Sequence, residues 1–531
     1  MSVNSDKLYD VAIIGYGPVG ATAANLLGRD GFETIVIEKE AEVFDKPRAI
    51  TFDQEVMRIF QSAGLALEIL PCTSKYRPAI YLGMNGQIIR RIDPSPEPFP
   101  LYWLPNYLFD QPYLEAVLRD GVNKYETVDV YLQQQLVALE QREDYVRLQV
   151  KDLNKGNVQK IDARYIWACD GAASPTRTMV GVDLEDLGFD EQWIVVDINV
   201  KDPSTLPDTN IQYCEPERPS TYVIGPNRHR RWEMMLLPNE TPEETLKEEN
   251  ILKLLTRWGE PANFEIRRAA IYRFHALVAQ EWRKGRVFLM GDAAHQTPPF
   301  MGQGMCQGIR DTANLIWKHG LVERLDNSGT LFDSYTLERK PHVKALTNFT
   351  IGLGETICMR DPVAAANRDK RLKADLDSGH MVTIRQNLIP DLLDGLIDLS
   401  PAGSPIKPAG GLFYQPLVRT LSGEDKPMDD AVTRGFLIVT TVASLLGSIP
   451  VKLEDWWRSI GGEFVTLNDT SAGKREGIIQ LKELNGVLTT FFEEWGCCCV
   501  IVRPDRYIYG AALDSQKLNS MLQTIKKRLT S

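Results

Sequence analysis

The sequence predicts an α/β protein, on two observations about the order of its strand and helix patterns. Residues 10–40 run through a buried strand (10–15), a glycine turn that leads into a helix (16–31) and a second strand (32–40). Residues 191–274 instead alternate apolar and polar side chains repeatedly, which is typical of an antiparallel or mixed sheet. We therefore expect a Rossmann-like α/β domain with a parallel sheet, interrupted by an inserted mixed β-sheet domain.

The other elements follow in chain order. Residues 71–100 alternate and are rich in proline, which predicts a β excursion away from the first domain. A helix at 110–122 and strand-like stretches at 128–150 and 163–177 return to that domain, and residues 286–295 resemble its last strand before a helix at 308–325. Residues 331–400 have a helical pattern, and the break "SPAGSPIKPAGG" at 400–411 precedes a C-terminal block.

The expected domain bounds follow from these patterns. The first domain is discontinuous and takes residues 1–75, 101–185 and 276–345, and the inserted β domain takes 76–100 and 186–275. A helical segment covers 346–400, and a C-terminal domain covers 401–531.

Composition excludes several classes of function. The net charge of -11 argues against a surface for nucleic acid or anionic membrane. The polar N-terminus shows no signal peptide, and the longest apolar run is broken by Gly447 and Pro450. None of the 8 cysteines forms a CxxC pair, and the 6 histidines form no HxH or HxxxH pair. We expect a cytoplasmic protein with reduced thiols and no metal.

The turn at residues 15–20 carries the pattern GxGxxG between a strand and a helix. Gly15 permits the tight turn, Gly17 lets the backbone approach a pyrophosphate, and Gly20 lets the helix pack closely on the strand. Glu38 ends the second strand, where a carboxylate accepts hydrogen bonds from ribose hydroxyls. Because no second complete fingerprint occurs, we predict one dedicated dinucleotide, either NAD(P) or FAD.

Two further segments follow predicted strands. "ACDGAASPTR" places Asp170, Gly171 and Arg177 after one strand, and "RVFLMGDAAHQTPPFMGQGMCQGIRD" places Asp292 after another. Together with the GxGxxG turn, these segments resemble the signature motifs of single-component FAD-dependent aromatic hydroxylases, which include p-hydroxybenzoate hydroxylase and phenol hydroxylase. The resemblance covers residues 1–345. Four segments are similar to the 3-(3-hydroxyphenyl)propionate hydroxylase group, namely residues 46–60, 213–236, 301–318 and 499–510. In that group the C-terminal domain is thioredoxin-like and lacks redox cysteines.

The resemblance implies a set of residues that bind FAD. They are Gly15, Gly17, Pro18, Gly20, Glu38, Lys39, Arg48, Gln111, Asp170, Gly171, Asp292, Pro299, Gly302, Gly304 and Met305. Asp292 would contact the ribityl chain. Pro298 and Pro299 would form a rigid apolar wall beside the isoalloxazine, and Gly302 and Gly304 would bring a helix N-terminus to its negative end.

The reaction implied by the resemblance is the hydroxylation of a phenol. NADH or NADPH reduces FAD, O2 then adds to give a C4a-hydroperoxyflavin, and its distal oxygen attacks the ring ortho to the hydroxyl. The expected substrate carries a carboxylate and is similar to 3-hydroxyphenylpropionate. Catalytic candidates are His295, Pro298, Gly302 and Tyr222, and candidates for substrate contact are Arg218, Tyr222 and His275. A phenol must also lose its proton, and none of these side chains is singled out for that task.

Other functions stay open at this point. The chain is also compatible with another flavoenzyme on the same fold, such as an epoxidase, a reductase or a halogenase, although the absence of a WxWxIP segment counts against the halogenase. A non-catalytic, dinucleotide-bound interaction protein is the alternative from another class. We expect a small phenolic partner, no nucleic acid and no membrane, and the one assembly that we consider is a homodimer.

Overall fold

The computed structural model describes residues 7–325, 330–379, 382–469 and 477–530. Its contacts divide the chain into two compact units. One unit comprises residues 1–95, 105–309 and 344–389, and the other comprises 96–104, 310–343 and 390–531. In the described residues, no helix combines the length and the apolar character needed to cross a membrane.

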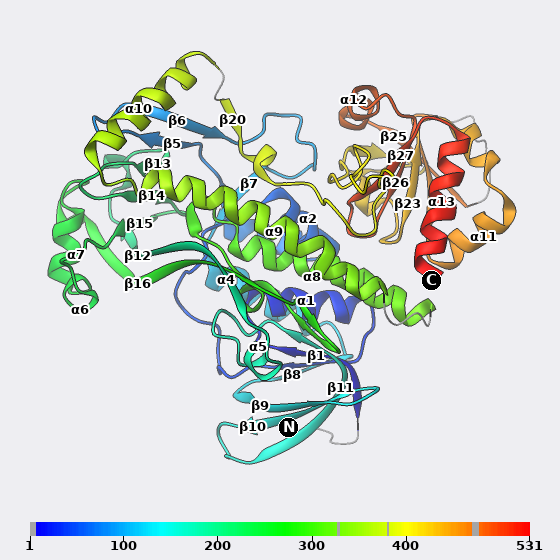
Figure 1. Ribbon diagram of the computed structural model, residues 1–531, viewed down its shortest axis with the longest axis horizontal. Coiled ribbons are helices and arrows are strands. Elements are labelled where there is room, and N and C mark those ends of the chain that lie inside the picture. The colour runs from blue at the N-terminus through cyan, green and yellow to red at the C-terminus, as the bar shows by residue number, and fades with distance from the viewer. Residues whose placement is uncertain (1–6, 326–329, 380–381, 470–476, 531) are drawn as a thin grey trace. The chain divides into compact units, whose positions relative to one another are not determined.

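The first sheet forms around the strand–turn–helix motif at the N-terminus (Figure 1). Its order is β17-β18-β11-β1-β2-β8, and the neighbours from β18 to β8 are parallel. The central strands β1 and β2 are mostly apolar and buried, as expected for a parallel sheet covered on both faces. The bounds are β1 (Leu8–Ile14), α1 (Pro18–Arg29), β2 (Thr34–Ile37), α4 (Gln111–Val122), β8 (Val128–Tyr131), β9 (Gln134–Gln141), β10 (Val146–Asp152), β11 (Val158–Ala168), β17 (Arg283–Lys284) and β18 (Val287–Leu289).

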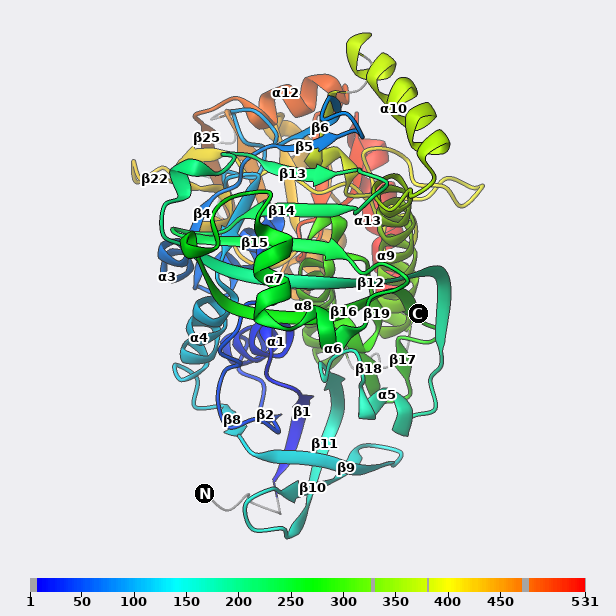
Figure 2. The same ribbon diagram turned by 90° about the vertical axis from the view of Figure 1, so that its left-hand side faces the viewer.

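The second sheet is mixed, as the alternating segments predict, and its strands lie side by side in Figure 2. Its order is β19-β16-β12-β15-β14-β13-β5-β6-β20, in which β13–β5 and β20–β6 are parallel and the other neighbours antiparallel. The bounds are β5 (Ala79–Leu82), β6 (Ile88–Asp93), β12 (Leu184–Val200), β13 (Asn210–Tyr213), β14 (Ser220–Ile224), β15 (His229–Met235), β16 (Phe264–Ala279), β19 (His295–Gln296) and β20 (Val382–Ile384).

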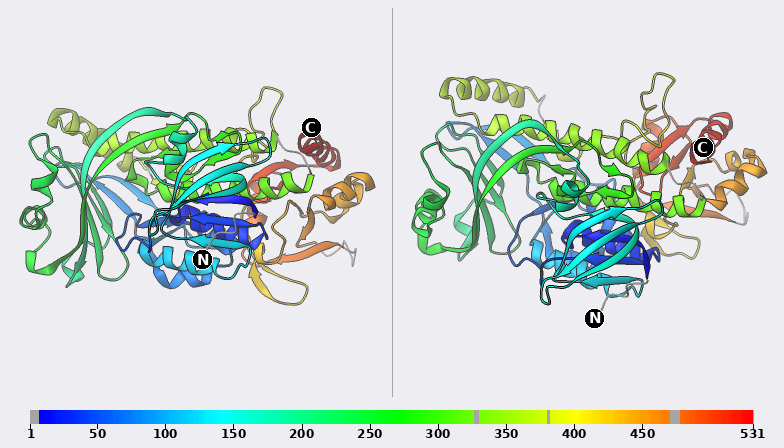
Figure 3. Two further views of the ribbon diagram at one scale, coloured as in Figure 1. Left: turned by 90° about the horizontal axis from the view of Figure 1, so that it is seen from below. Right: turned by 60° about the horizontal axis from the view of Figure 1, so that its bottom comes forward.

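Alternation along these strands creates two faces with separate hydrophobic clusters. Trp193 and Val195 belong to one cluster, whereas Ile194 and Val196 belong to the other. The β12–β16 register shifts between Asp186 and Asp190 and again at Asp197, and such bulges bend a strand. Figure 3 shows that β12 and β16 curve along their length. We call the face that carries Trp193 and Val195 the inner face.

A short third sheet and several helices complete this unit. The sheet has the order β3-β7-β4, with β3 (Thr51–Asp53), β4 (Thr73–Lys75) and β7 (Asn106–Phe109). Asp53 caps α2 (Gln54–Ser62) by accepting a hydrogen bond from the Val56 backbone N–H, which explains why the helix begins there. The helices α3 (Ala66–Ile69), α5 (Pro175–Met179), α6 (Pro242–Thr245) and α7 (Glu248–Leu255) are short.

The expected helical stretch at 331–400 is only partly helical. The helices α8 (Gly304–Leu325), α9 (Thr330–Ile357) and α10 (Pro362–Asp377) are followed by β20 and by the short helix η6 (Arg385–Leu388). Residues 382–384 read Val-Thr-Ile, and such β-branched side chains favour a strand over a helix. This segment therefore joins the second sheet through β6.

The C-terminal block is a mixed α/β domain. Its sheet has the order β22-β21-β25-β24-β23-β26-β27, with β23, β24 and β25 parallel to one another. The bounds are β21 (Leu417–Arg419), β22 (Asp425–Pro427), β23 (Leu437–Thr440), α11 (Val451–Ser459), β24 (Glu463–Leu467), β25 (Ile478–Glu483), α12 (Val487–Glu494), β26 (Cys499–Val502), β27 (Ile508–Ala512) and α13 (Ser515–Thr530).

A buried ionic cluster explains why residues 310–343 group with this block rather than with the first domain. Glu338 accepts hydrogen bonds from Lys318 at 2.7 Å and from Arg503 at 2.7 Å, and all three side chains are 0% exposed. Burial alone would raise the pKa of Glu338, but Arg503 and Lys318 outweigh that effect and hold the pKa below its usual value. The four-domain division drawn from the sequence stays an expectation.

Candidate functional site

The glycine turn between β1 and α1 contains two glycines fixed by packing and one that is not. Gly15 has φ +97°, and a Cβ there would lie 2.5 Å from the carbonyl oxygen of Cys169. A Cβ on Gly20 would collide with the Gly15 carbonyl oxygen. Around Gly17, by contrast, no described atom lies within 4 Å of the Cβ position. Packing therefore does not explain the glycine at 17, whereas a ligand that approaches the backbone does.

Glu38, at the end of β2, is bonded to this turn. Its carboxylate accepts the Tyr16 backbone N–H at 2.6 Å and the Glu40 backbone N–H at 2.8 Å, and the residue is 7% exposed. These bonds hold the end of β2 against the turn. A contact between Glu38 and a ribose stays a prediction. Pro18 occupies the first turn of α1, and Lys39 is exposed with Glu40 3.8 Å away.

The segment that follows β18 makes a tight turn, η4 (Gly291–Ala293), against α1. Gly291 has φ +57°, and a Cβ there would lie 3.0 Å from Val19. The Asp292 side chain is accessible to solvent, yet desolvation by the protein around it raises its pKa, while His295 and Arg48 act in the opposite direction. Asp292 is therefore close enough to Arg48 for their charges to interact.

The middle motif, "ACDGAASPTR", makes hydrogen bonds within itself and to the η4 turn. The Asp170 carboxylate accepts hydrogen bonds from the Ser174 hydroxyl at 2.5 Å and from the Thr176 backbone N–H at 3.0 Å, and Ser174 is the N-cap of α5. Arg177 in turn donates to the carbonyl oxygen of Ala293 at 2.9 Å. The motif thus holds the η4 turn in place, and Gly171 beside it has φ +80°.

The segment from Pro298 to Met305 presents a second pair of contrasting glycines. Gly302 has φ +60°, and a Cβ there would overlap the Thr51 methyl group. Around the Cβ position of Gly304, which begins α8, no described atom lies within 4 Å. Pro298 is buried, and Pro299 and Met305 are partly buried. The open space at Gly304 resembles that at Gly17.

A buried ionic network holds the loop that carries Arg48. Arg231 donates to the Arg48 carbonyl oxygen at 2.6 Å and to Asp197 at 2.7 Å, and Arg268 donates to the Pro47 carbonyl oxygen at 2.5 Å. Burial would raise the pKa of Asp197, but Arg231 and His229 outweigh it and keep the carboxyl ionised. The exposed Arg48 guanidinium lies 4.7 Å from the Phe44 ring centroid.

Gln111 fixes the same loop from α4. Its side-chain oxygen accepts the Ala49 backbone N–H at 2.7 Å, and the residue is 5% exposed. A direct contact of Gln111 with FAD stays a prediction.

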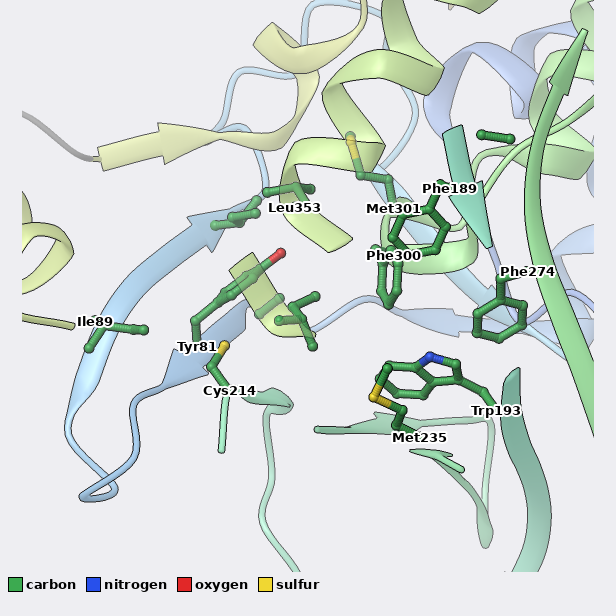
Figure 4. Packing of buried hydrophobic residues seen from close by; sticks show 14 of the residues in the cluster. Tyr81, Ile89, Phe189, Trp193, Cys214, Met235, Phe274, Phe300, Met301 and Leu353 are labelled. Carbon is green, nitrogen blue, oxygen red and sulfur yellow. The ribbon is translucent and has the colours of Figure 1, made fainter. Parts of the chain in front are cut away.

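An aromatic cluster covers the inner face of the second sheet next to the Pro298–Met305 segment. Phe300 packs edge-on against Trp193 at 5.6 Å and Phe189 at 5.7 Å between ring centroids. Phe274 and Met235 complete this part of the cluster, and Figure 4 shows these five side chains grouped together. A planar apolar substrate fits such a wall.

Four predicted catalytic or substrate residues lie apart from this wall. Tyr222 is buried in the cluster of the opposite face and donates to the Pro207 carbonyl oxygen at 3.0 Å. Arg218 is paired with Glu240. His275 lies 3.7 Å from Asp190, and His295 is buried and stacked on Trp282 at 5.2 Å. The structure thus gives these side chains other contacts, and their catalytic roles stay predictions.

The observations at Gly17, Gly304 and Asp292 test whether the described residues fit FAD. Two glycines have free space where a side chain would stand, and the charge of Arg48 acts on a partly desolvated carboxylate, Asp292. A dinucleotide fills such space, accepts from backbone amides and pairs with a cation. The residues therefore fit FAD.

Several residues of this site escape sequence reasoning. Asp197 and Arg268 are separated from Arg48 by more than a hundred positions, and no local motif marks them. The segment "NRHRRWE" shows that several cationic side chains are close in the sequence. It does not predict that Arg231 donates a hydrogen bond to the backbone carbonyl oxygen of Arg48. Tyr81, Arg90 and Arg385, on the inner face, have no sequence signal.

The chain matches known proteins over almost its whole length. Residues 8–350 match the family described as FAD binding domain, and residues 410–528 match the HcaD C-terminal domain. The probable NADH-specific resorcinol 4-hydroxylase of Rhodococcus jostii (strain RHA1) is 33% identical over 524 residues, covering 98% of this chain and 95% of that protein. The 3-(3-hydroxy-phenyl)propionate/3-hydroxycinnamic acid hydroxylase of Escherichia coli (strain K12) is 31% identical over 535 residues, covering 98% and 94%.

Solved structures with the same fold include two complexes. The flavin-dependent monooxygenase PieE in complex with FAD and substrate has a TM-score of 0.81 at 18% identity, covering 99% of both chains. Aklavinone-11 hydroxylase in a ternary complex with FAD and aklavinone has a TM-score of 0.78 at 20% identity, covering 98% of this chain and 99% of that one. At these identities the likeness concerns the fold.

Proposed function

Because this chain belongs to the FAD binding domain family and, within it, to the FAD-dependent aromatic hydroxylases, we propose that it uses NADH and O2 to hydroxylate a phenol that carries a carboxylate side chain. The hydroxyl group enters ortho to the phenol hydroxyl, which gives a catechol-type product. The observation that supports this proposal most strongly is the pairing of a cofactor cradle, open at Gly17 and Gly304, with the aromatic wall around Phe300 and Trp193.

The names of the relatives support the substrate class. Resorcinol and 3-(3-hydroxyphenyl)propionate are both phenols with a second substituent in the meta position. Position 4 of resorcinol is ortho to a hydroxyl group, which supports the regiochemistry. The first of these relatives is named as NADH-specific, which supports NADH over NADPH.

The residues that would hold FAD come from all three motifs. Gly17 and the start of α1 would receive the pyrophosphate, Arg48 would pair with its charge, and Asp292 would accept from the ribityl hydroxyls. When bound, FAD supplies the redox chemistry, in which a hydride is taken from the nicotinamide and one oxygen atom is passed to the ring. The chain orients the reactants and keeps water away from them.

Exclusion of water is the clearest contribution of the protein side chains. Phe300, Trp193 and Met301 are all less than 10% exposed, and together they form an apolar boundary next to the start of α8. Such a boundary protects reactive oxygen species from decay by proton transfer with bulk water. Pro298 and Pro299 keep the segment rigid because their φ angles are fixed.

The start of α8 contributes charge stabilisation. A helix N-terminus presents unpaired backbone N–H groups and the positive end of the helix dipole. Gly304 leaves room for a ligand to approach these groups. Negative charge that develops on a ligand at this position is therefore stabilised.

The test uses the purified protein with its flavin. We expect a yellow protein whose NADH oxidation accelerates on addition of 3-(3-hydroxyphenyl)propionate, with a product heavier by one oxygen atom. Labelled O2 should place that atom in the product. Rapid NADH oxidation that yields only hydrogen peroxide would show that the added phenol is an effector rather than the substrate.

The same test separates the alternatives. A colourless protein that FAD does not reconstitute would contradict the proposal and favour the non-catalytic interaction protein, with NAD as its bound dinucleotide. A yellow protein that oxidises NADH without any phenol would favour a reductase. A cytoplasmic location and self-association into a homodimer stay predictions.

A further inference from the structure

We propose that Tyr81, Arg90 and Arg385 form the part of the substrate site that binds the carboxylate group of the phenol. This inference rests on the proposed function, because it assigns one end of its substrate to named residues. It also decides between the two substrate types of the relatives, since an acid has the carboxylate and resorcinol does not.

Tyr81 and Arg90 stand opposite each other on β5 and β6. They are register partners, and the Arg90 guanidinium carbon lies 5.8 Å from the Tyr81 ring centroid. Tyr81 is 1% exposed and belongs to the same cluster as Trp193 and Phe300. Figure 4 shows its hydroxyl directed into this cluster, on the side of Leu353. Both side chains therefore face the wall to which we assign the aromatic ring.

One polar atom of this pair has no partner of its own. Within the described part of the chain, the Arg90 Nε is buried and makes no hydrogen bond. Buried donors without acceptors are rare in folded proteins and are costly. A ligand with acceptor oxygens supplies the partner that this nitrogen lacks.

Arg385 adds a second cation that no carboxylate neutralises. The residue is 5% exposed, and its Nη1 donates to the Tyr76 hydroxyl at 3.2 Å. Its Nη2 donates to the carbonyl oxygen of Met301, directly before Gly302. All of its acceptors among the described residues are neutral. The charge of Arg385 is therefore held beside the segment to which we assign the flavin.

Two buried arginines of this unit are neutralised by a carboxylate. Arg231 pairs with Asp197 at 2.7 Å, and Arg368 pairs with Asp369 at 2.7 Å. For Arg90 and Arg385, no ion pair occurs within the residues that the structure describes. The inner face thus carries an excess of positive charge at one end of the aromatic wall.

The charges of both arginines act on Tyr81. Burial raises the pKa of Tyr81, whereas the charges of Arg90 and Arg385 act to lower it. Cys214 and Tyr76 are the other titratable side chains that act on this group, and burial keeps the Cys214 thiol protonated by raising its pKa. None of these neighbours is a carboxylate, so that a bound anion meets two positive charges and a phenol donor.

The chemistry that fits is a carboxylate on a short chain attached to the ring. A carboxylate accepts several hydrogen bonds at once and forms charge-assisted bonds with guanidinium groups. An uncharged hydroxyl, as in resorcinol, gains much less from two cations. The site therefore favours a 3-(3-hydroxyphenyl)alkanoate over a neutral meta-substituted phenol.

The experiment compares an acid with its neutral counterpart on the FAD-bound protein. The two ligands are 3-(3-hydroxyphenyl)propionate and 3-(3-hydroxyphenyl)propan-1-ol, and their dissociation constants are measured from changes in flavin absorbance. The variant is Arg90→Met, and Arg91→Met is the matched control, because Arg91 is the neighbour on β6, is 55% exposed and pairs with Asp93. Flavin content and melting temperature are recorded for each variant.

We expect Arg90→Met to weaken binding of the acid by about 10- to 100-fold and to leave binding of the alcohol within about 2-fold. Arg90→Lys should recover part of the affinity for the acid because it restores the charge, and Tyr81→Phe should weaken the acid selectively. Equal loss for both ligands, or no loss for the acid, would overturn the assignment. Arg91→Met should behave as the unmodified protein.

Failure of the proposed function has a different signature. If neither ligand perturbs the flavin of the unmodified protein or accelerates NADH oxidation, the hydroxylase proposal fails and this inference fails with it. If the unmodified protein hydroxylates the acid but Arg90→Met does so with an unchanged KM, only the assignment of the carboxylate site is refuted.

Discussion

Replacing Gly302 by alanine should weaken the segment that connects the aromatic wall to α8. Gly302 adopts φ +60° and ψ 36°, which is the left-handed region. That conformation costs a residue with a Cβ about 1–2 kcal/mol. The new Cβ would also overlap the Thr51 methyl group, and overpacking of this kind costs about 1–3 kcal/mol. The total is about 2–5 kcal/mol.

The Thr51 side chain is held in place, so that the overpacking part of this cost can be measured separately. Its hydroxyl donates to the Tyr107 carbonyl oxygen at 2.8 Å, and the residue is 7% exposed. Thr51→Ser removes the methyl group and keeps the hydroxyl. The double variant should therefore regain the overpacking part, about 1–3 kcal/mol, while the left-handed strain remains.

Thermal release of FAD, followed by flavin fluorescence, is the assay. The release temperature should fall in the order unmodified protein, Gly302→Ala with Thr51→Ser, and Gly302→Ala alone. Thr51→Ser alone serves as the reference for the cycle. If Gly302→Ala releases FAD at the temperature of the unmodified protein, the turn relaxes freely and the packing argument is wrong.

Four further predictions concern the cofactor cradle and the buried charges. Gly304→Val should leave stability nearly unchanged, because its Cβ position is open, but should impair flavin reduction or hydroxylation in stopped-flow assays even when FAD is bound. Asp292→Ala should lower the FAD content after gel filtration, and full retention would contradict its place in the cradle. Burial raises the pKa of Glu233 to about 7 from the ordinary value of 4.5. Between pH 4.5 and about pH 7, Glu233 therefore takes up a proton when the protein folds, and the free energy of unfolding falls as the pH rises through this range. Thermal unfolding at pH 5 and pH 8 should show that Glu233→Gln removes about 3 kcal/mol of this pH-dependent loss of stability. Glu338→Ala leaves Lys318 buried without its carboxylate, whereas Arg503 keeps Asp505, and the variant should cost about 3–5 kcal/mol in thermal unfolding.

Local patterns predicted the fold class, and the resemblance of three motifs to a known family implied the enzyme class; both expectations are confirmed. The GxGxxG turn is short, so that its strand, helix and glycines are all adjacent in the sequence. The alternation of residues 191–274 likewise predicted a mixed sheet, because a strand with one face in each of two cores must alternate.

Pattern reasoning was less successful where distant contacts override local preference. The helical signal at 331–400 ends at Asp377, because residues 382–384 gain a hydrogen-bonded partner in β6. Likewise, residues 310–343 group with the C-terminal block, to which the buried Glu338 binds them through Arg503.

The candidate site shows the same division between near and distant information. The sequence alone was enough to identify the three motifs and to place Gly15, Gly17, Gly20 and Asp292 in them, because each motif is a contiguous turn after a strand. The sequence could not assign the partners of charged side chains. Arg218 and Arg231 are both arginines of the second domain, but Arg218 pairs with Glu240 and Arg231 pairs with Asp197. Whether an arginine is neutralised depends on which carboxylate the fold brings within a few ångströms. Arg90 and Arg385 are far apart in the sequence, and for this reason their common effect on Tyr81 is found only in the folded structure.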